Sequence, residues 1–150
     1  MSYLTKLNIG ENNMKNINID EMLDKALEAR KLAYTPYSNF KVGACILLSN
    51  GNYICGSNVE NASYGLTSCA ERNTLFQTYN LGYNKNDIKA LLIVGDTEGP
   101  CSPCGACRQV ISELTDKDMP IILANLKREY VILTINDLLP YSFTKDDLDV

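Results

Sequence analysis

Cysteine and glutamate residues in two short stretches of the sequence could together bind a metal ion and move a proton. Cys69 is followed two residues later by Glu71, and a Pro-Cys-x-x-Cys pattern further along the chain holds Cys104 and Cys107. Zn²⁺ takes four ligands in a tetrahedron, and catalytic zinc sites usually draw three from the protein and leave the fourth position to water. Cys69, Cys104 and Cys107 supply three such protein ligands, and Glu71 is close enough in sequence to reach the bound water. These residues predict a catalytic zinc site with Glu71 as its proton shuttle.

A purely structural site is the alternative for the same cysteines. Cys101 extends the second pair to Cys101-x-x-Cys104-x-x-Cys107, which would allow a four-cysteine zinc site or an iron–sulfur site. The chain would then be a non-catalytic interaction domain. That hypothesis leaves Glu71 without a role, so the catalytic interpretation is favoured.

Each cysteine stretch opens a run whose apolar residues recur at helical spacing. We expect the first helix to be capped by Thr67 or Ser68 and to end near Gly82, and the second to run from about Cys104 to Leu114. Residues 89–95 between them are typical of a buried strand. In a right-handed crossover both helices begin at the same edge of the sheet, so the cysteines can meet there. Helix N-termini also favour the thiolate form that binds metal.

The chain before the first cysteine is predicted to form a helix and then a hairpin. The helix should run from Asp20, its cap, to about Tyr34, where a Thr-Pro pair stops it. Alternating apolar residues predict a strand over residues 40–48. Asn50-Gly51 is typical of a type I′ turn, and residues 53–59 return as a second strand. Gly43 in the first strand indicates a bulge or the close approach of another segment.

Two further strands are predicted after the second cysteine helix, over residues 120–124 and 130–133. Only about five residues separate them, whereas a parallel connection needs a dozen or more, so the pair is antiparallel if the strands are neighbours. Residues 134–137 then form a capping pattern for a last helical turn.

Composition limits the number of domains and the kinds of partner. The chain has 150 residues, 45% of them hydrophobic, which suits one domain. We expect residues 1–17 to be a loose extension and residues 18–150 to be that domain. A net charge of −4 without a basic run argues against nucleic acid as a partner. No apolar stretch approaches the ~20 residues of a membrane span, and no signal-peptide region is recognisable.

These observations predict a cytoplasmic protein that acts on small molecules. Clustered cysteines in a reducing compartment are typical metal ligands, whereas disulfides are typical of secreted chains. Cys45 and Cys55 lie in the predicted strands of the hairpin. We expect them to be ordinary buried thiols.

Cys-Ala-Glu-Arg at residues 69–72 and Pro-Cys-Gly-Ala-Cys-Arg-Gln at residues 103–109 resemble the two motifs of the cytidine deaminase family. The resemblance covers about residues 34–143. Within the family, the chain resembles the short-chain, homotetrameric type, in which cysteines alone hold the zinc ion. This resemblance implies a three-layer α/β/α fold with a mixed five-stranded sheet and an antiparallel last strand pair. The cofactor would be one Zn²⁺ per subunit. The implied reaction is hydrolytic deamination of cytidine and deoxycytidine to uridine and deoxyuridine, in pyrimidine salvage.

The resemblance also assigns substrate contacts. Phe40 matches the phenylalanine that packs on the pyrimidine, and Asn58 and Glu60 match the pair that holds the ribose hydroxyls. Ala70, next to the first ligand, falls at a further substrate-binding position. Because an antiparallel last strand pair resembles the enzymes that act on free nucleosides, a polynucleotide substrate is not expected.

Three more residues have roles by resemblance. Tyr64 and Phe143 match positions that neighbouring subunits donate to shared active sites, which implies a homotetramer. Arg72 matches an arginine that offsets the negative charge of three thiolates on one zinc ion. A deaminase of another cytosine nucleoside, such as blasticidin S, shares both cysteine motifs and stays open as an alternative substrate class.

Overall fold

A mixed five-stranded β-sheet forms the centre of the computed structural model, which describes residues 10–148. The strand order is β2-β1-β3-β4-β5. The strands are β1 (Val42–Leu48), β2 (Tyr53–Ser57), β3 (Ile88–Gly95), β4 (Ile121–Asn125) and β5 (Tyr130–Leu133). Strand β1 runs antiparallel to β2 and β3, β3 is parallel to β4, and β4 is antiparallel to β5. The predicted mixed sheet with an antiparallel last pair is confirmed.

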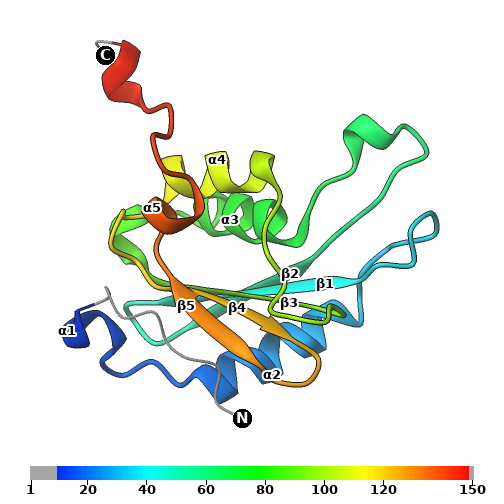
Figure 1. Cartoon of the computed structure of the whole chain (residues 1–150), viewed down its shortest axis with the longest axis horizontal. Coiled ribbons are helices and arrows are strands. Elements are labelled where there is room, and N and C mark those ends of the chain that lie inside the picture. The colour runs from blue at the N-terminus through cyan, green and yellow to red at the C-terminus, as the bar shows by residue number, and fades with distance from the viewer. Residues whose placement is uncertain (1–9, 149–150) are drawn as a thin grey trace.

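Helices cover both faces of the sheet, so the predicted three layers are present (Figure 1). Helix α2 packs on one face, and α3, α4 and α5 lie on the other. The α-helices are α1 (Glu11–Met14), α2 (Ile19–Arg30), α3 (Ala70–Asn80), α4 (Gly105–Leu114) and α5 (Ile135–Leu138). The part of the chain that the structure describes also has three short 3₁₀ helices, η1 (Tyr64–Leu66), η2 (Lys85–Asp87) and η3 (Lys145–Leu148).

Strand β1 is buried at every position because a helix layer covers each of its faces. Ala44 and Ile46 pack in the cluster under α3 and α4. Cys45 and Leu47 point to the opposite face and pack in the cluster under α2. The apolar alternation along this strand therefore marks only one of two buried faces.

Gly43 allows α2 to approach β1 closely, which is the second of the two predicted explanations for this glycine. A Cβ atom at Gly43 would collide with the carbonyl oxygen of Ala26 and would lie 2.9 Å from the Cβ of Arg30. Arg30 also donates from Nε to the carbonyl oxygen of Lys41 at 2.9 Å. The contact holds α2 against the start of β1.

The helix predicted from Asp20 to about Tyr34 is α2, and both of its ends differ from the prediction. Its N-terminal cap is Asn18 and not Asp20, because the Asn18 side chain accepts a backbone N–H from the first turn. The helix ends at Arg30 and not at Tyr34. The backbone of Tyr34 instead donates to the carbonyl oxygen of residue 58 and accepts from the N–H of residue 60. These tertiary hydrogen bonds override the local helical pattern.

The hairpin between β1 and β2 is not the predicted type I′ turn. Such a turn needs positive φ at both central residues, but Gly51 has φ of 87° and Asn50 does not have a positive φ. The N–H of Leu48 donates to the carbonyl oxygen of Asn52 at 2.9 Å, and the N–H of Gly51 donates to that of Leu48. The result is a three-residue loop with glycine at its left-handed position.

Residues 1–9 of the predicted loose extension lie outside the described residues. Residues 11–14 form α1, and Met14 and Ile17 pack against the cluster under α2. Asn13 donates from Nδ2 to the carbonyl oxygen of Asp118 at 3.3 Å. This part of the predicted extension therefore packs on the sheet domain.

Candidate metal centre and active site

The sheet topology places the starts of α3 and α4 at one edge. Strands β2 and β3 are both antiparallel to β1, so they run parallel to each other and their carboxyl ends lie at the same edge. Helix α3 follows β2, and α4 follows β3. Cys69 and Cys104 are the residues immediately before these two helices. The expected N-caps Thr67 and Ser68 are therefore wrong, since Cys69 itself occupies that position.

Three thiols meet at this edge. The sulfur atoms of Cys69, Cys104 and Cys107 all lie within 4.8 Å of one another, and those of Cys69 and Cys104 are 3.9 Å apart. Tetrahedral zinc with Zn–S bonds of about 2.3 Å separates two sulfur ligands by about 3.8 Å. The chain contains no histidine, and an all-thiolate set suits zinc well. The donor atoms therefore fit a zinc ion.

Cys101 does not belong to this thiol cluster. Its backbone N–H donates to the carbonyl oxygen of Ala124 at 3.0 Å. Its sulfur packs against Gly95, where an added Cβ would lie only 2.8 Å away. Burial raises the pKa of Cys101 to about 11, so it remains a neutral thiol at pH 7. The four-cysteine arrangement of the structural alternative is not formed.

Glu71 lies in the first turn of α3 and is only 4% exposed. Burial raises the pKa of its carboxyl group to about 7, and the nearby charge of Cys69 adds to that effect. Arg72 acts in the opposite direction. A carboxyl group that titrates near neutral pH can both accept and donate a proton under physiological conditions.

Arg72 places a cation beside the first thiolate. Its Nη2 atom lies 3.6 Å from the sulfur of Cys69 and donates to the carbonyl oxygen of Thr67 at 3.3 Å. Hydrogen bonds from Cys107, Arg72 and Cys104 lower the pKa of Cys69 to about 5, so this residue is a thiolate at neutral pH. The same interaction with Cys69 raises the pKa of Cys107. Its proton would be released when a metal binds.

The carboxylate of Glu60 anchors the loop before β1. It accepts hydrogen bonds from the backbone N–H groups of Tyr37 and Ser38, both at 3.1 Å, and from the Ser38 hydroxyl. These bonds, led by that of the hydroxyl, lower the pKa of Glu60. A cavity of about 340 Å³ is lined by Tyr37, Ser38, Glu60, Tyr64 and Thr67. Glu60 therefore lines this cavity together with Tyr64 and Thr67, which belong to the segment that precedes Cys69.

Asn58 connects the end of β2 to the start of β1. Its Oδ1 atom accepts from the N–H of Val42 at 2.8 Å, and its Nδ2 atom donates to the carbonyl oxygen of Phe40 at 2.9 Å. The side chain of Asn58 is 8% exposed, whereas that of Phe40 is 39% exposed. An amide has further donor and acceptor capacity beyond these two bonds. Asn58 thus positions Phe40 whether or not it also binds a ligand.

A family profile connects this geometry with known proteins. The profile described as "Cytidine and deoxycytidylate deaminase zinc-binding region" matches residues 17–123, which contain the three clustered cysteines and Glu71. The chain belongs to the cytidine and deoxycytidylate deaminase family. Zinc is the cofactor of that family region, and the three-cysteine cluster is where this chain can hold it.

Individual deaminases match over most of the chain. A cytidine deaminase of Halalkalibacterium halodurans is 47% identical over 128 residues, which cover 85% of this chain and 96% of that protein. The cytidine deaminase of Sporosarcina psychrophila is 45% identical and covers 88% and 96%. The crystal structure of a cytidine deaminase from Burkholderia pseudomallei has a TM-score of 0.82 at 44% identity, with 85% of this chain and 100% of that chain covered.

The remaining predicted site residues differ in burial. The Ala70 side chain is fully buried in the core. Tyr64 is 75% exposed on the η1 segment, which projects from the body of the domain (Figure 1), and its ring packs edge-on against Tyr37 at 6.0 Å. Phe143 is 58% exposed. Both aromatic side chains therefore present apolar surface to the outside of this chain.

From the sequence, Arg108 and Gln109 follow the last ligand and were candidates for contacts with the metal ligands, but the structure gives them another role. Arg108 donates to the carbonyl oxygens of Pro103 and Leu138, and Gln109 donates to that of Phe143 at 2.8 Å. The two side chains thus anchor the C-terminal segment and are not hydrogen-bonded to the thiols. Ser38 was missed, since nothing local in the sequence indicates a contact with a residue 22 positions away.

Proposed function

We propose that this protein is a zinc-dependent cytidine deaminase, which hydrolyses cytidine and deoxycytidine to uridine and deoxyuridine. The observation that carries the proposal is the buried carboxyl group of Glu71, with its pKa of about 7, next to three sulfurs spaced for zinc. The named relatives, which match along most of the chain, support the same substrate class. Pyrimidine salvage would be the corresponding metabolic role.

Cys69, Cys104 and Cys107 would hold the zinc ion, which when bound supplies the Lewis-acid chemistry that activates water at neutral pH. Glu71 moves the protons. As a carboxylate it accepts one proton of the attacking water and, as an acid, delivers it to N3 of the cytosine ring; it then accepts the second proton of that water and delivers it to the amine that leaves from C4. Its burial keeps bulk water from competing for those protons.

The substrate contacts follow the positions of the exposed and hydrogen-bonding groups. We assign the pyrimidine face to Phe40 and the ribose hydroxyls to Glu60 and to the remaining capacity of Asn58. Because the Ala70 methyl group is buried, its backbone at the start of α3 is the part that could meet the base.

The proposed reaction is tested with the purified, zinc-loaded protein. We expect it to convert cytidine and deoxycytidine to uridine and deoxyuridine. The reaction is monitored by the decrease in the absorbance of the cytosine ring. Cytidine within a single-stranded oligonucleotide should be a poor substrate, since the chain lacks a basic stripe. Turnover of blasticidin S without turnover of either nucleoside would assign the other substrate class.

Glu60→Ala should lower kcat/KM for cytidine about 10- to 100-fold, the usual cost of a lost hydrogen bond to a charged group. Deamination of free cytosine, which has no sugar, should change much less. Ser38→Ala is the matched control, because it removes one bond to Glu60 and leaves the carboxylate in place. Equal losses for cytidine and cytosine would mean that Glu60 acts only by holding the loop.

Arg72→Ala should lower turnover or zinc affinity about 10- to 100-fold, as is typical for residues that orient metal ligands. The reason is its contact with the sulfur of Cys69, which offsets the charge of the thiolates. Arg72→Lys should restore part of the loss, since it keeps the charge but not the planar fork. Unchanged activity and zinc content in both variants would leave Arg72 as a structural residue.

We also infer a cytoplasmic homotetramer. Its cytoplasmic placement is supported by six cysteines that are all free. Separately, none of the helices within residues 10–148 has the length and apolar character needed to cross a membrane. The exposed aromatic side chains Tyr64 and Phe143 support association between copies. Light scattering should give four times the 16.7 kDa of the chain, and a monomer mass would contradict the assembly.

A further inference from the structure

Cys45 and Cys55 form a pair of thiols that the proposed reaction does not use. They are direct partners across the antiparallel strands β1 and β2, and their sulfur atoms are 2.8 Å apart. Both belong to the cluster under α2, on the face of the sheet opposite α3 and α4. The expectation that they are ordinary buried thiols therefore misses their proximity.

The strand register gives this pair a geometry compatible with a covalent bond. The N–H of Leu48 donates to the carbonyl oxygen of Asn52, and pairs along an antiparallel ladder alternate between hydrogen-bonded and non-hydrogen-bonded. Three steps further along, Cys45 and Cys55 are a non-hydrogen-bonded pair, for which the Cα atoms lie about 4.5 Å apart. Disulfides span Cα separations of about 4.4–6.8 Å. The strands need not separate or shift register to join the two sulfurs.

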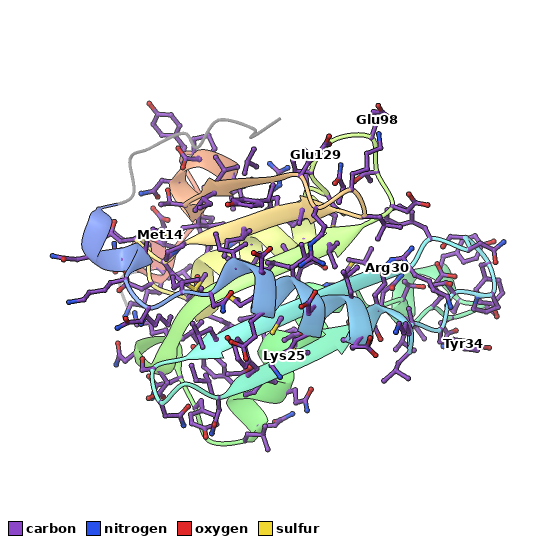
Figure 2. All side chains as sticks on the ribbon, turned by 90° about the horizontal axis from the view of Figure 1, so that it is seen from below. Met14, Lys25, Arg30, Tyr34, Glu98 and Glu129 are labelled. Atoms are coloured by element: carbon purple, nitrogen blue, oxygen red, sulfur yellow. The ribbon has the colours of Figure 1, made fainter. Side chains whose placement is uncertain are left out.

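The two thiols differ in access and in acidity. Cys55 is half-buried on β2, an edge strand, whereas Cys45 is fully buried on β1. The interaction with Cys45 and the charge of Lys25 lower the pKa of Cys55. Lys25 projects from α2 on this side of the sheet (Figure 2), with Nζ 5.0 Å from the ring centre of Tyr53. The pKa of Cys45 is raised by its hydrogen bond with Cys55 and by burial. An accessible, more acidic thiol beside a second thiol is typical of reversible oxidation sites.

We propose that Cys45 and Cys55 form a reversible cross-strand disulfide by exchange with a low-molecular-weight disulfide such as glutathione disulfide. The Cys55 thiolate attacks one sulfur of the small disulfide, which forms a mixed disulfide and releases one small thiolate. Cys45 then loses its proton and attacks the Cys55 sulfur, which releases the second small thiolate. Two protein thiols are oxidised and one small disulfide is reduced to two thiols.

The position of the pair separates this chemistry from the metal centre. Cys69, Cys104 and Cys107 lie at the starts of α3 and α4, across the sheet from the pair. The disulfide would join strands that are already paired, so it should leave the active site intact and restrain the edge strand β2. We expect oxidation to raise the melting temperature by about 5 °C with activity unchanged.

The experiment treats zinc-loaded protein with glutathione disulfide, removes the reagent, denatures the protein and alkylates the remaining thiols. Chymotrypsin cleaves after Tyr53, between the two cysteines, so the fragments with Cys45 and Cys55 should stay linked until reduced. The intact protein should lose about 2 Da, the mass of the two hydrogens, and regain it with dithiothreitol. Zinc content should be the same before and after.

Two variants complete the test. Cys55→Ser should abolish both the linkage and the rise in melting temperature, whereas Cys101→Ser, which also removes a thiol outside the zinc cluster, should keep both. The proposal is overturned if Cys45 and Cys55 are both alkylated after oxidation, or if Cys55 keeps a stable glutathione adduct. It is equally overturned if Cys55 is linked to a cysteine other than Cys45. The alkylation pattern of the unsubstituted protein decides the matter even if a variant folds poorly.

Discussion

Glu71→Gln is expected to lower kcat for cytidine by about 10²- to 10⁴-fold, the usual contribution of a positioned acid or base. Glutamine fills nearly the same volume, so the buried first turn of α3 should keep its packing. It cannot accept and return a proton, and the transfers to N3 and to the leaving amine would lose their catalyst. Steady-state rates on the zinc-loaded variant measure the effect.

Zinc content and substrate binding are the accompanying measurements for Glu71→Gln. Both should remain close to those of the unsubstituted protein, since Glu71 is not one of the clustered ligands. Glu113→Gln makes the same chemical change at an exposed position on α4 and should leave the rate unaltered. A Glu71→Gln rate within a few-fold of the unsubstituted enzyme would exclude Glu71 from proton transfer.

Cys107→Ser is expected to abolish stable zinc binding and, with it, activity. Cys107 is fully buried within the three-sulfur cluster, and a hydroxyl is a much poorer ligand for zinc than a thiolate. A tightly bound ligand at about 1,000 times its Kd adds about 4 kcal/mol to stability, so the melting temperature should fall by about 10 °C. Metal analysis and thermal melting check the two results.

Cys101→Ser is the matched control for the ligand variant. Cys101 is similarly buried and lies in the same motif, but it is outside the cluster. It should retain full zinc content, although serine in its apolar position could lower stability slightly. Equal loss of zinc from both variants would restore the four-cysteine interpretation and remove the support for a catalytic centre.

Much of the metal centre could be predicted because its geometry depends on local pattern and connectivity. The helix starts place Cys69 and Cys104, and the crossover rule brings the two starts to one sheet edge. The antiparallel pairing of β4 and β5 followed from the short connection alone. These features need no knowledge of which side chains meet across the fold.

The parts that could not be predicted depend on contacts between distant residues. Helix α2 stops early because Tyr34 pairs with the chain around residues 58–60. The family resemblance assigned Asn58 and Glu60 to the ribose hydroxyls, but nothing in the sequence indicated that they also bond to Val42, Phe40 and the loop before β1. The proximity of Cys45 and Cys55 likewise depends on the exact register of a hairpin whose turn type was predicted wrongly.

The starts of α3 and α4 have a consequence for local unfolding. Neither helix has a side-chain hydrogen bond at its N-terminal cap, and each cap position is a cysteine of the metal cluster. The first N–H groups of a helix have no partner within it, and no cap side chain supplies one here, so the metal cluster is a restraint that the two helix starts share. Amide hydrogen exchange should therefore accelerate in both first turns together when zinc is withdrawn, while the amides of β1 and β3 stay protected. Bound zinc would thus couple the local unfolding of the first turns of α3 and α4, while the sheet remains folded.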